Sequence, residues 1–193
     1  MAASQIENRD ALARELAQVR FGQLYRDQGR AILAYALRRV EDPEDAADVV
    51  AETFLVAWRR LDEVPMDPGA RLWLFAVARR VLANLHRAER RRTRLGERIA
   101  ETLRTELASG PAPRGEAAEV LRAMGELGAD DRELLLLVSW EELSPGEAAK
   151  VLGVSALAAR SRLHRARRRL RALLEQREES GSGSTELEME EAR

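Results

Sequence analysis

Apolar residues recur at helical spacing along nearly the whole chain, and this period constrains the fold more than any other feature. Within 70–94, for example, leucine, valine and alanine occupy positions 74, 77, 78, 81, 82 and 85, which form one face of an α-helix. The alternation that marks a β-strand is absent, and β-branched residues are few. The sequence therefore predicts an all-α protein.

A stretch rich in proline and glycine divides the helical pattern into two halves. It reads Ser-Gly-Pro-Ala-Pro-Arg-Gly at 109–115, a composition typical of linkers. We therefore expect two small helical domains, at 11–95 and 116–175, joined by a flexible linker at 96–115. The segment 176–193 combines Gly-Ser-Gly-Ser with acidic residues and is expected to be a disordered acidic tail.

Capping and helix-breaking residues predict where the helices begin and end. In the second domain, Asp130 with Glu133 forms a D-x-x-E variant of the capping box and predicts a helix start. In the first domain we expect one or two helices over 11–40, a helix over 42–61, a loop at 64–69 and a long helix at about 70–94.

A short segment of the second domain has the capping and turn residues of a helix-turn-helix. Ser144 can cap a helix, with Pro145 at the first helical position and Glu147 completing a capping box. Gly153 can adopt the left-handed conformation that ends this helix, and Ser155 can cap the next one. This order of short helix, tight turn and capped second helix is typical of DNA-binding modules.

The helix that follows, 155–174, carries seven arginines and no acidic residue. Recognition helices present residues near their N-terminus to base edges, while later cations hold phosphates. Arg160, Ser161 and His164 are therefore candidate base readers, and the arginines of 167–171 are candidate phosphate ligands. An arginine-rich surface helix that only covers a bundle is the structural alternative.

An acidic block in the first domain contains six carboxylates and no basic residue over 41–52. Asp45, Asp48 and Glu52 follow the spacing i, i+3 and i+7, so they share one face of the predicted helix and repel one another. A basic partner surface would relieve this repulsion. A merely solubilising acidic face is the alternative.

A second pattern in the first domain joins an aromatic ring to polar and cationic groups on one helical stripe. This combination suits single-stranded nucleic acid, through base stacking and phosphate contacts. The alternative is that the tryptophan belongs to the core. The stripe consists of Trp73, Arg80, Asn84, Arg87 and Arg91.

Both domains carry motifs of a known family. The pattern D-x-x-D-V-V-x-E-x-F-x-x-x-W-R at 45–59, with R-x-W-L-x-x-x-A-R at 71–79, resembles domain two of bacterial RNA polymerase sigma factors. The nearest group is the extracytoplasmic-function (ECF) group. S-P-x-E-A-A at 144–149, L-G-V-S at 152–155 and R-S-R-L-x-R-A-R at 160–167 resemble domain four of the same group.

The resemblance implies three contact surfaces. In the family, the acidic helix docks on the clamp helices of the polymerase; the matching residues here are Asp45, Asp48, Glu52, Phe54 and Trp58. The minus-ten element is contacted by the positions of Trp73, Arg80, Asn84, Arg87 and Arg91. The minus-thirty-five element is contacted by those of Ser155, Arg160, Ser161, His164, Arg165, Arg167, Arg168 and Arg171. The chain departs from the usual pattern at Arg80, where many members have Asn, and at 157–159, where Leu-Ala-Ala replaces the common Gly-Thr-Val.

The expected function is that of a sigma factor, which binds core RNA polymerase and promoter DNA and directs promoter recognition, DNA opening and transcription initiation. It is not expected to be an enzyme. The chain has no cysteine, no Gly-rich phosphate loop and no triad-like set, so neither a cofactor nor a metal is expected. An anti-sigma protein is a further candidate partner. The alternatives are a polymerase-independent helix-turn-helix regulator that binds operators, and a helical adaptor whose basic helix binds an acidic protein.

The sequence also bears on location. No apolar run approaches the ~20 residues that span a bilayer. The charged N-terminal segment lacks the apolar stretch of a secretory signal. We therefore expect a cytoplasmic protein without membrane insertion.

Overall fold

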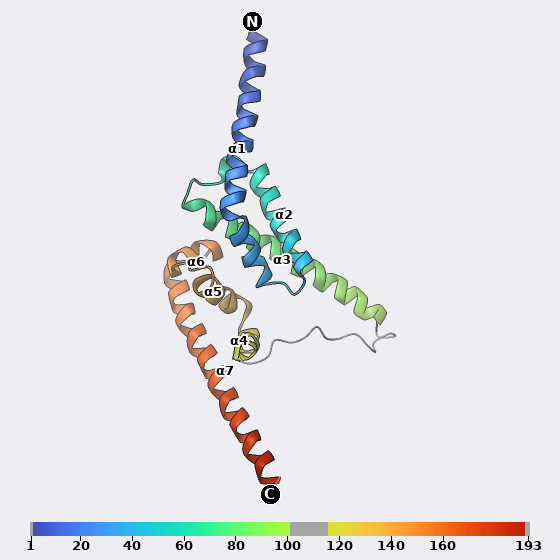
Figure 1. Cartoon of the computed structure of the whole chain (residues 1–193), viewed down its shortest axis with the longest axis vertical. Helices are drawn as coiled ribbons and strands as arrows, with labels where there is room; N and C mark the ends of the chain where they lie inside the picture. Colours follow the sequence, from blue (N-terminus) through green and yellow to red (C-terminus); the bar gives the residue numbers. More distant parts are fainter. Residues whose placement is uncertain (1, 101–115, 192–193) are drawn as a thin grey trace. The chain divides into compact units, whose positions relative to one another are not determined.

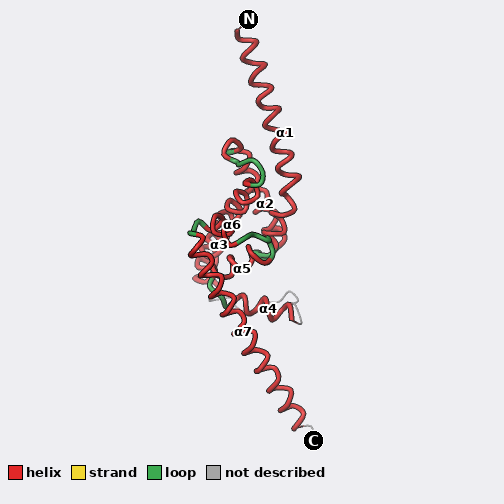
Figure 2. Tube along the Cα trace, turned by 90° about the vertical axis from the view of Figure 1, so that its left-hand side faces the viewer, coloured by secondary structure: helices red, strands yellow, loops and turns green. Residues whose placement is uncertain are grey.

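The chain is described by a computed structural model, which covers the backbone of residues 2–100 and 116–191 and the side chains of 8–9, 11–88, 119–120 and 122–177. Within these residues the regular structure is entirely helical, as Figure 2 shows. The chain divides into two compact units, Met1–Arg104 and Thr105–Arg193. The prediction of an all-α protein with two helical domains is therefore confirmed.

The first unit consists of three α-helices and one short 3-10 turn. They are α1 (Ala2–Leu37), α2 (Pro43–Arg59), η1 (Leu61–Glu63) and α3 (Gly69–Ala100) (Figure 1). The three α-helices pack against one another in all pairings. Their shared core includes Ile32, Tyr35, Phe54, Leu74 and Phe75, all of which are buried. This burial follows the helical period of the sequence, because each helix turns one apolar face inward.

Local signals explain where α2 begins, whereas α1 and α3 extend beyond the predicted limits. The side chain of Asp42 caps α2 by accepting a hydrogen bond from the backbone N–H of Glu44 at 2.8 Å, and Pro43 occupies the first helical position. The expected one or two helices over 11–40 form a single helix, α1, which begins earlier, at Ala2. Helix α3 reaches Ala100, so it includes the first residues of the predicted linker. The rest of that linker, 101–115, lies outside the described residues.

The second unit consists of four helices around a leucine-rich core. They are α4 (Glu116–Gly125), α5 (Ala129–Ser139), α6 (Pro145–Leu152) and α7 (Ala156–Glu191). Helix α7 packs against the other three. It buries Ala159, Leu163 and Ala166 on the side that meets them.

The helix-turn-helix forms as its capping residues predict. Ser144 and Glu147 make the reciprocal capping box at the start of α6, with Pro145 at the first helical position. Gly153 ends α6 with φ of 70°, in the left-handed region that glycine adopts without strain. The Ser155 hydroxyl accepts a hydrogen bond from Ala158 N–H at 3.1 Å and so caps α7.

Two sequence predictions differ from the structure in this unit. Helix α5 begins after Gly128 without a side-chain cap. The prediction of a capping box by Asp130 and Glu133 is therefore wrong. Asp130 lies inside the first turn, where its carboxylate accepts a hydrogen bond from Arg162 of α7 at 3.1 Å. Helix α7 continues to Glu191, and so includes residues 176–191 of the tail that was expected to be disordered. Glutamate, which is frequent there, favours helix and opposes the cost of about 1 kcal/mol for each glycine.

In the described part of the chain, no helix is both long enough and apolar enough to cross a membrane.

Candidate nucleic-acid interface

Helix α2 presents an acidic face opposite its buried face. Asp48 and Glu52 are exposed, and Asp45 is partly buried. The other side of the helix buries alanine, valine, threonine and phenylalanine against α1 and α3. No side chain in the described ranges forms an ion pair with Asp48 or Glu52. Both carboxylates are therefore available to a cationic partner.

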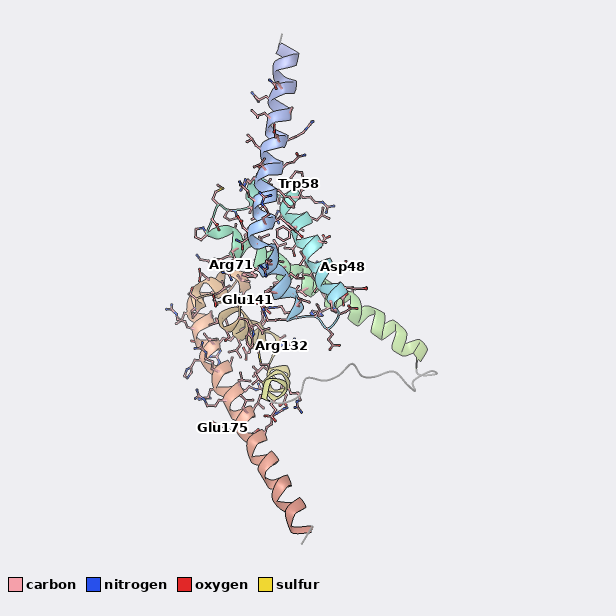
Figure 3. All side chains as sticks on the ribbon, in the orientation of Figure 1. Asp48, Trp58, Arg71, Arg132, Glu141 and Glu175 are labelled. Carbon is pink, nitrogen blue, oxygen red and sulfur yellow. The ribbon has the colours of Figure 1, made fainter. Side chains whose placement is uncertain are left out.

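An aromatic cluster at the far end of α2 joins this helix to α1. Phe54 is buried, at 3% exposure, and its ring centroid lies 4.8 Å from that of Tyr25 and 6.2 Å from that of Phe21. Trp58 packs edge-on against Phe21 at 5.2 Å yet remains 42% exposed. Asp48 and Trp58 are labelled on α2 in Figure 3. Phe54 and Trp58 were both predicted to contact polymerase. Phe54 is buried and can act only by packing beneath the surface of α2, whereas Trp58 is exposed and can contact a partner directly.

A groove between α2 and α3 brings the two predicted sites of this unit together. Its rim includes Glu52 from the acidic face and Arg80 and Asn84 from the expected DNA-binding stripe. Arg60 completes the rim, and Val56, Val77 and Val81 are its apolar lining. A groove with an apolar lining, two guanidinium groups and an amide suits a nucleobase and its phosphate.

The remaining residues of the stripe lie along α3. Trp73 is partly buried, and the guanidinium carbon of Arg60 lies 5.9 Å from the centre of a Trp73 ring. Arg87 is exposed and donates a hydrogen bond from Nη2 to Oδ1 of Asn84 at 2.5 Å. The side chain of Arg91 lies outside the described residues. The structure therefore brings Arg80, Asn84 and Arg87 onto one exposed surface.

Arg60 is a candidate contact that the sequence analysis missed. Its Nε donates to Oε1 of Glu63 at 2.9 Å, and its Nη2 makes a second bond to Oε2. The hydrogen bond from Arg60 lowers the pKa of the Glu63 carboxyl, and the same bond raises the pKa of Arg60. The pair therefore stays ionised at neutral pH, and a nucleic-acid phosphate would compete with Glu63 for Arg60. The only sequence signal was a second arginine after Trp58, which does not reveal its neighbours on α3.

In the second unit, α7 separates its faces as predicted. The polar and cationic side chains expected to contact DNA are all exposed, namely Ser155, Arg160, Ser161, His164, Arg165, Arg167, Arg168 and Arg171. Arg160 folds back toward the start of the helix, where its Nε donates to the carbonyl of Ala156 at 3.2 Å. The short capped helix, the tight turn and the exposed basic helix together form a complete helix-turn-helix module.

Comparison with known proteins matches both units to one family. The model of Sigma-70 region 2 matches residues 24–92, and that of Sigma-70 region 4 matches 117–170. The RNA polymerase sigma factor NccH of Alcaligenes xylosoxydans xylosoxydans is 38% identical over 176 residues, which cover 86% of this chain and 94% of NccH. The ECF RNA polymerase sigma factor SigL of Mycobacterium tuberculosis is 33% identical over 171 residues, with coverage of 86% and 94%. The chain belongs to the sigma-70 family, in its ECF group.

A solved structure shows the same fold. The sigma factor RpoE from Bartonella quintana, in complex with the anti-sigma factor NepR, superposes with a TM-score of 0.58 at 28% identity. The match covers 80% of this chain and 96% of that one. The resemblance inferred from the motifs is therefore confirmed for both domains of this sigma factor.

One arginine of the basic helix of this sigma factor is only partly exposed. Arg162 turns toward α5, where Nη1 lies 3.1 Å from Oδ2 of Asp130 and Nε lies 3.6 Å from Oδ1 of Asp131. These ion pairs connect α7 to the first turn of α5. Arg162 thus orients the basic helix, whereas its neighbours Ser161 and Arg165 face outward.

Proposed function

We propose that this sigma factor divides promoter recognition between its two domains. Residues 11–95 bind the polymerase clamp and the minus-ten element, and residues 116–175 bind the minus-thirty-five element. Residues 96–115 link them, and 176–193 form an acidic tail. The polymerase performs the nucleotidyl transfer, so this chain supplies promoter position and strand opening rather than a catalytic group, and it acts where the polymerase does, in the cytoplasm.

The observation that carries the proposal is the adjacency of two chemically opposite surfaces in the first domain. Glu52 belongs both to the acidic face of α2 and to the rim of the α2–α3 groove, where Arg80 and Asn84 lie. A domain of this kind can hold a cationic protein surface and a strand of DNA side by side. An operator-binding regulator without polymerase would have no use for the acidic face.

Two surfaces are assigned to DNA. In the groove, Arg60, Arg80 and Asn84 suit an unstacked base and its phosphate, with Trp73 and Arg87 beside them. On α7, the residues nearest the N-terminus face the base edges, and Arg167, Arg168 and Arg171 hold phosphates. Each surface alone is small, but connection through the linker and through polymerase gives both a high effective concentration at the promoter.

The decisive experiment reverses the charge of the acidic face. The double variant Asp48→Lys with Glu52→Lys is expected to abolish co-purification with core RNA polymerase and promoter-directed transcription, because it repels a cationic clamp. Both side chains are exposed, so the helical circular dichroism spectrum should be unchanged.

A matched control reverses the same amount of charge at two other exposed carboxylates, Glu15 and Glu119. This Glu15→Lys with Glu119→Lys variant should bind polymerase as the unaltered protein does. Equal retention of polymerase by both double variants would reject the clamp assignment. Specific DNA binding of undiminished strength without polymerase would favour the operator-binding regulator.

An anti-sigma protein is a further partner that we propose on the strength of the RpoE–NepR complex.

A further inference from the structure

Leu157 is an exposed apolar side chain at the N-terminal end of the basic helix α7. It is the second residue of α7 and is 72% exposed. Leu163, less than two turns later on the same helix, is 4% exposed. A single exposed leucine is common on protein surfaces, so exposure alone does not indicate a binding contact. The position of Leu157 on α7 does.

The position is that of a base reader. Leu157, Arg160 and Ser161 follow the spacing i, i+3 and i+4, and His164 continues it at i+7. The four side chains therefore form one stripe of α7, and all four are exposed. Leu157 is the member nearest the N-terminus of the helix, which is the end that enters the major groove in a helix-turn-helix.

The chemistry at this end of the helix is apolar. Ala156 and Ala158 flank Leu157 and are exposed as well, and the hydroxyl of Ser155 is engaged by the N–H of Ala158. The first turn therefore offers base edges a methyl-rich surface beside the guanidinium of Arg160. In the major groove, the C5-methyl group of thymine is the apolar feature that base edges present.

We propose that Leu157 contacts the C5-methyl group of a thymine in the upstream promoter element and selects for thymine at that position. The inference rests on the proposed function, since it assigns a base to the minus-thirty-five surface. It adds an apolar contact to the hydrogen-bond donors and cations of that surface.

The test uses holoenzyme reconstituted from core RNA polymerase and this chain. A transcription selection from promoters with a randomised upstream region first identifies the preferred element. Each thymine of that element is then replaced in turn by deoxyuridine, which lacks only the C5-methyl group. At one position the replacement should weaken promoter binding by about fourfold, the equivalent of one methyl group returned to water.

Two variants assign the effect to the side chain. Leu157→Ala should weaken binding to the thymine promoter by a similar or larger factor and should make it insensitive to deoxyuridine at that position. Leu157→Met, which keeps an apolar side chain of similar volume, should retain the sensitivity.

The outcomes separate this inference from the proposed function. Absence of promoter-directed transcription with the unaltered protein would reject the proposed function itself. Normal transcription from an element without thymine, or equal deoxyuridine sensitivity of the unaltered protein and Leu157→Ala, would reject only the thymine contact. Loss of polymerase binding by Leu157→Ala would also overturn it, because the leucine would then serve a protein interface.

Discussion

Replacing Arg162 by glutamine should lower the unfolding free energy of the second domain without lowering its electrostatic affinity for DNA. Arg162 contacts Asp130 at 3.1 Å and Asp131 at 3.6 Å, and its side chain is 35% exposed. Partly exposed ion pairs contribute about 0.2–1 kcal/mol each, so the loss of both should cost about 1 kcal/mol. For a unit of this size, that corresponds to a fall of about 4–8 °C in the melting temperature.

The same variant should not change the salt dependence of DNA binding. Each phosphate contact adds about 0.9 to the slope of log K against the log of the salt concentration. Arg168→Gln should lower this slope for holoenzyme on promoter DNA by about 0.9, because Arg168 faces outward. Arg162→Gln should leave the slope unchanged, since its guanidinium is directed to α5.

Thermal unfolding and salt-dependent binding together show whether Arg162 stabilises the contact between α7 and α5 or binds a DNA phosphate. The double variant Asp130→Asn with Asp131→Asn should lose about as much stability as Arg162→Gln, and combining all three changes should add little, because they remove one shared interaction. The reasoning fails if Arg162→Gln lowers the salt slope as much as Arg168→Gln does while the melting temperature stays constant.

Three further predictions follow from particular side chains. Glu142 has φ of 57°, so Glu142→Gly should stabilise the second domain by about 1 kcal/mol, measured as a rise in the urea midpoint; a fall would refute this. Phe54→Ala should cost about 3–5 kcal/mol of unfolding free energy, whereas Trp58→Ala should reduce polymerase co-purification with little effect on unfolding; the opposite pattern would contradict their placement. Glu63→Gln should strengthen holoenzyme binding to single-stranded minus-ten DNA, because it frees Arg60, and unchanged affinity would argue against an Arg60 contact.

The features that could be predicted from the sequence are those set by residues within about one helical turn. The capping box of Ser144 and Glu147, the left-handed Gly153 and the Ser155 cap all depend on neighbours three or four positions away. The inward and outward faces of each helix follow from the helical period in the same way. The order of the motifs was also sufficient to indicate the sigma factor family for both domains.

The features that only the tertiary structure decided depend on side chains from different helices. Asp130 carries a helix-start signal, yet α5 begins at Ala129, and the Asp130 carboxylate, inside the first turn, accepts a hydrogen bond from Arg162 of α7. Phe54 and Trp58 lie one turn apart on α2 and carry similar apolar signals. The packing of α1 buries the first and leaves the second 42% exposed.

The candidate DNA site shows the same division. Arg80, Asn84 and Arg87 could be placed on one stripe because they belong to one helix. Arg60 could not be added to them, since it directly follows the end of α2 and reaches the groove only through the packing of α2 on α3. The sequence by itself therefore determined the helices, their faces and the family of this protein. The tertiary structure decided which charges pair with each other and which remain for polymerase and DNA, because ion pairs form between residues that are distant along the chain.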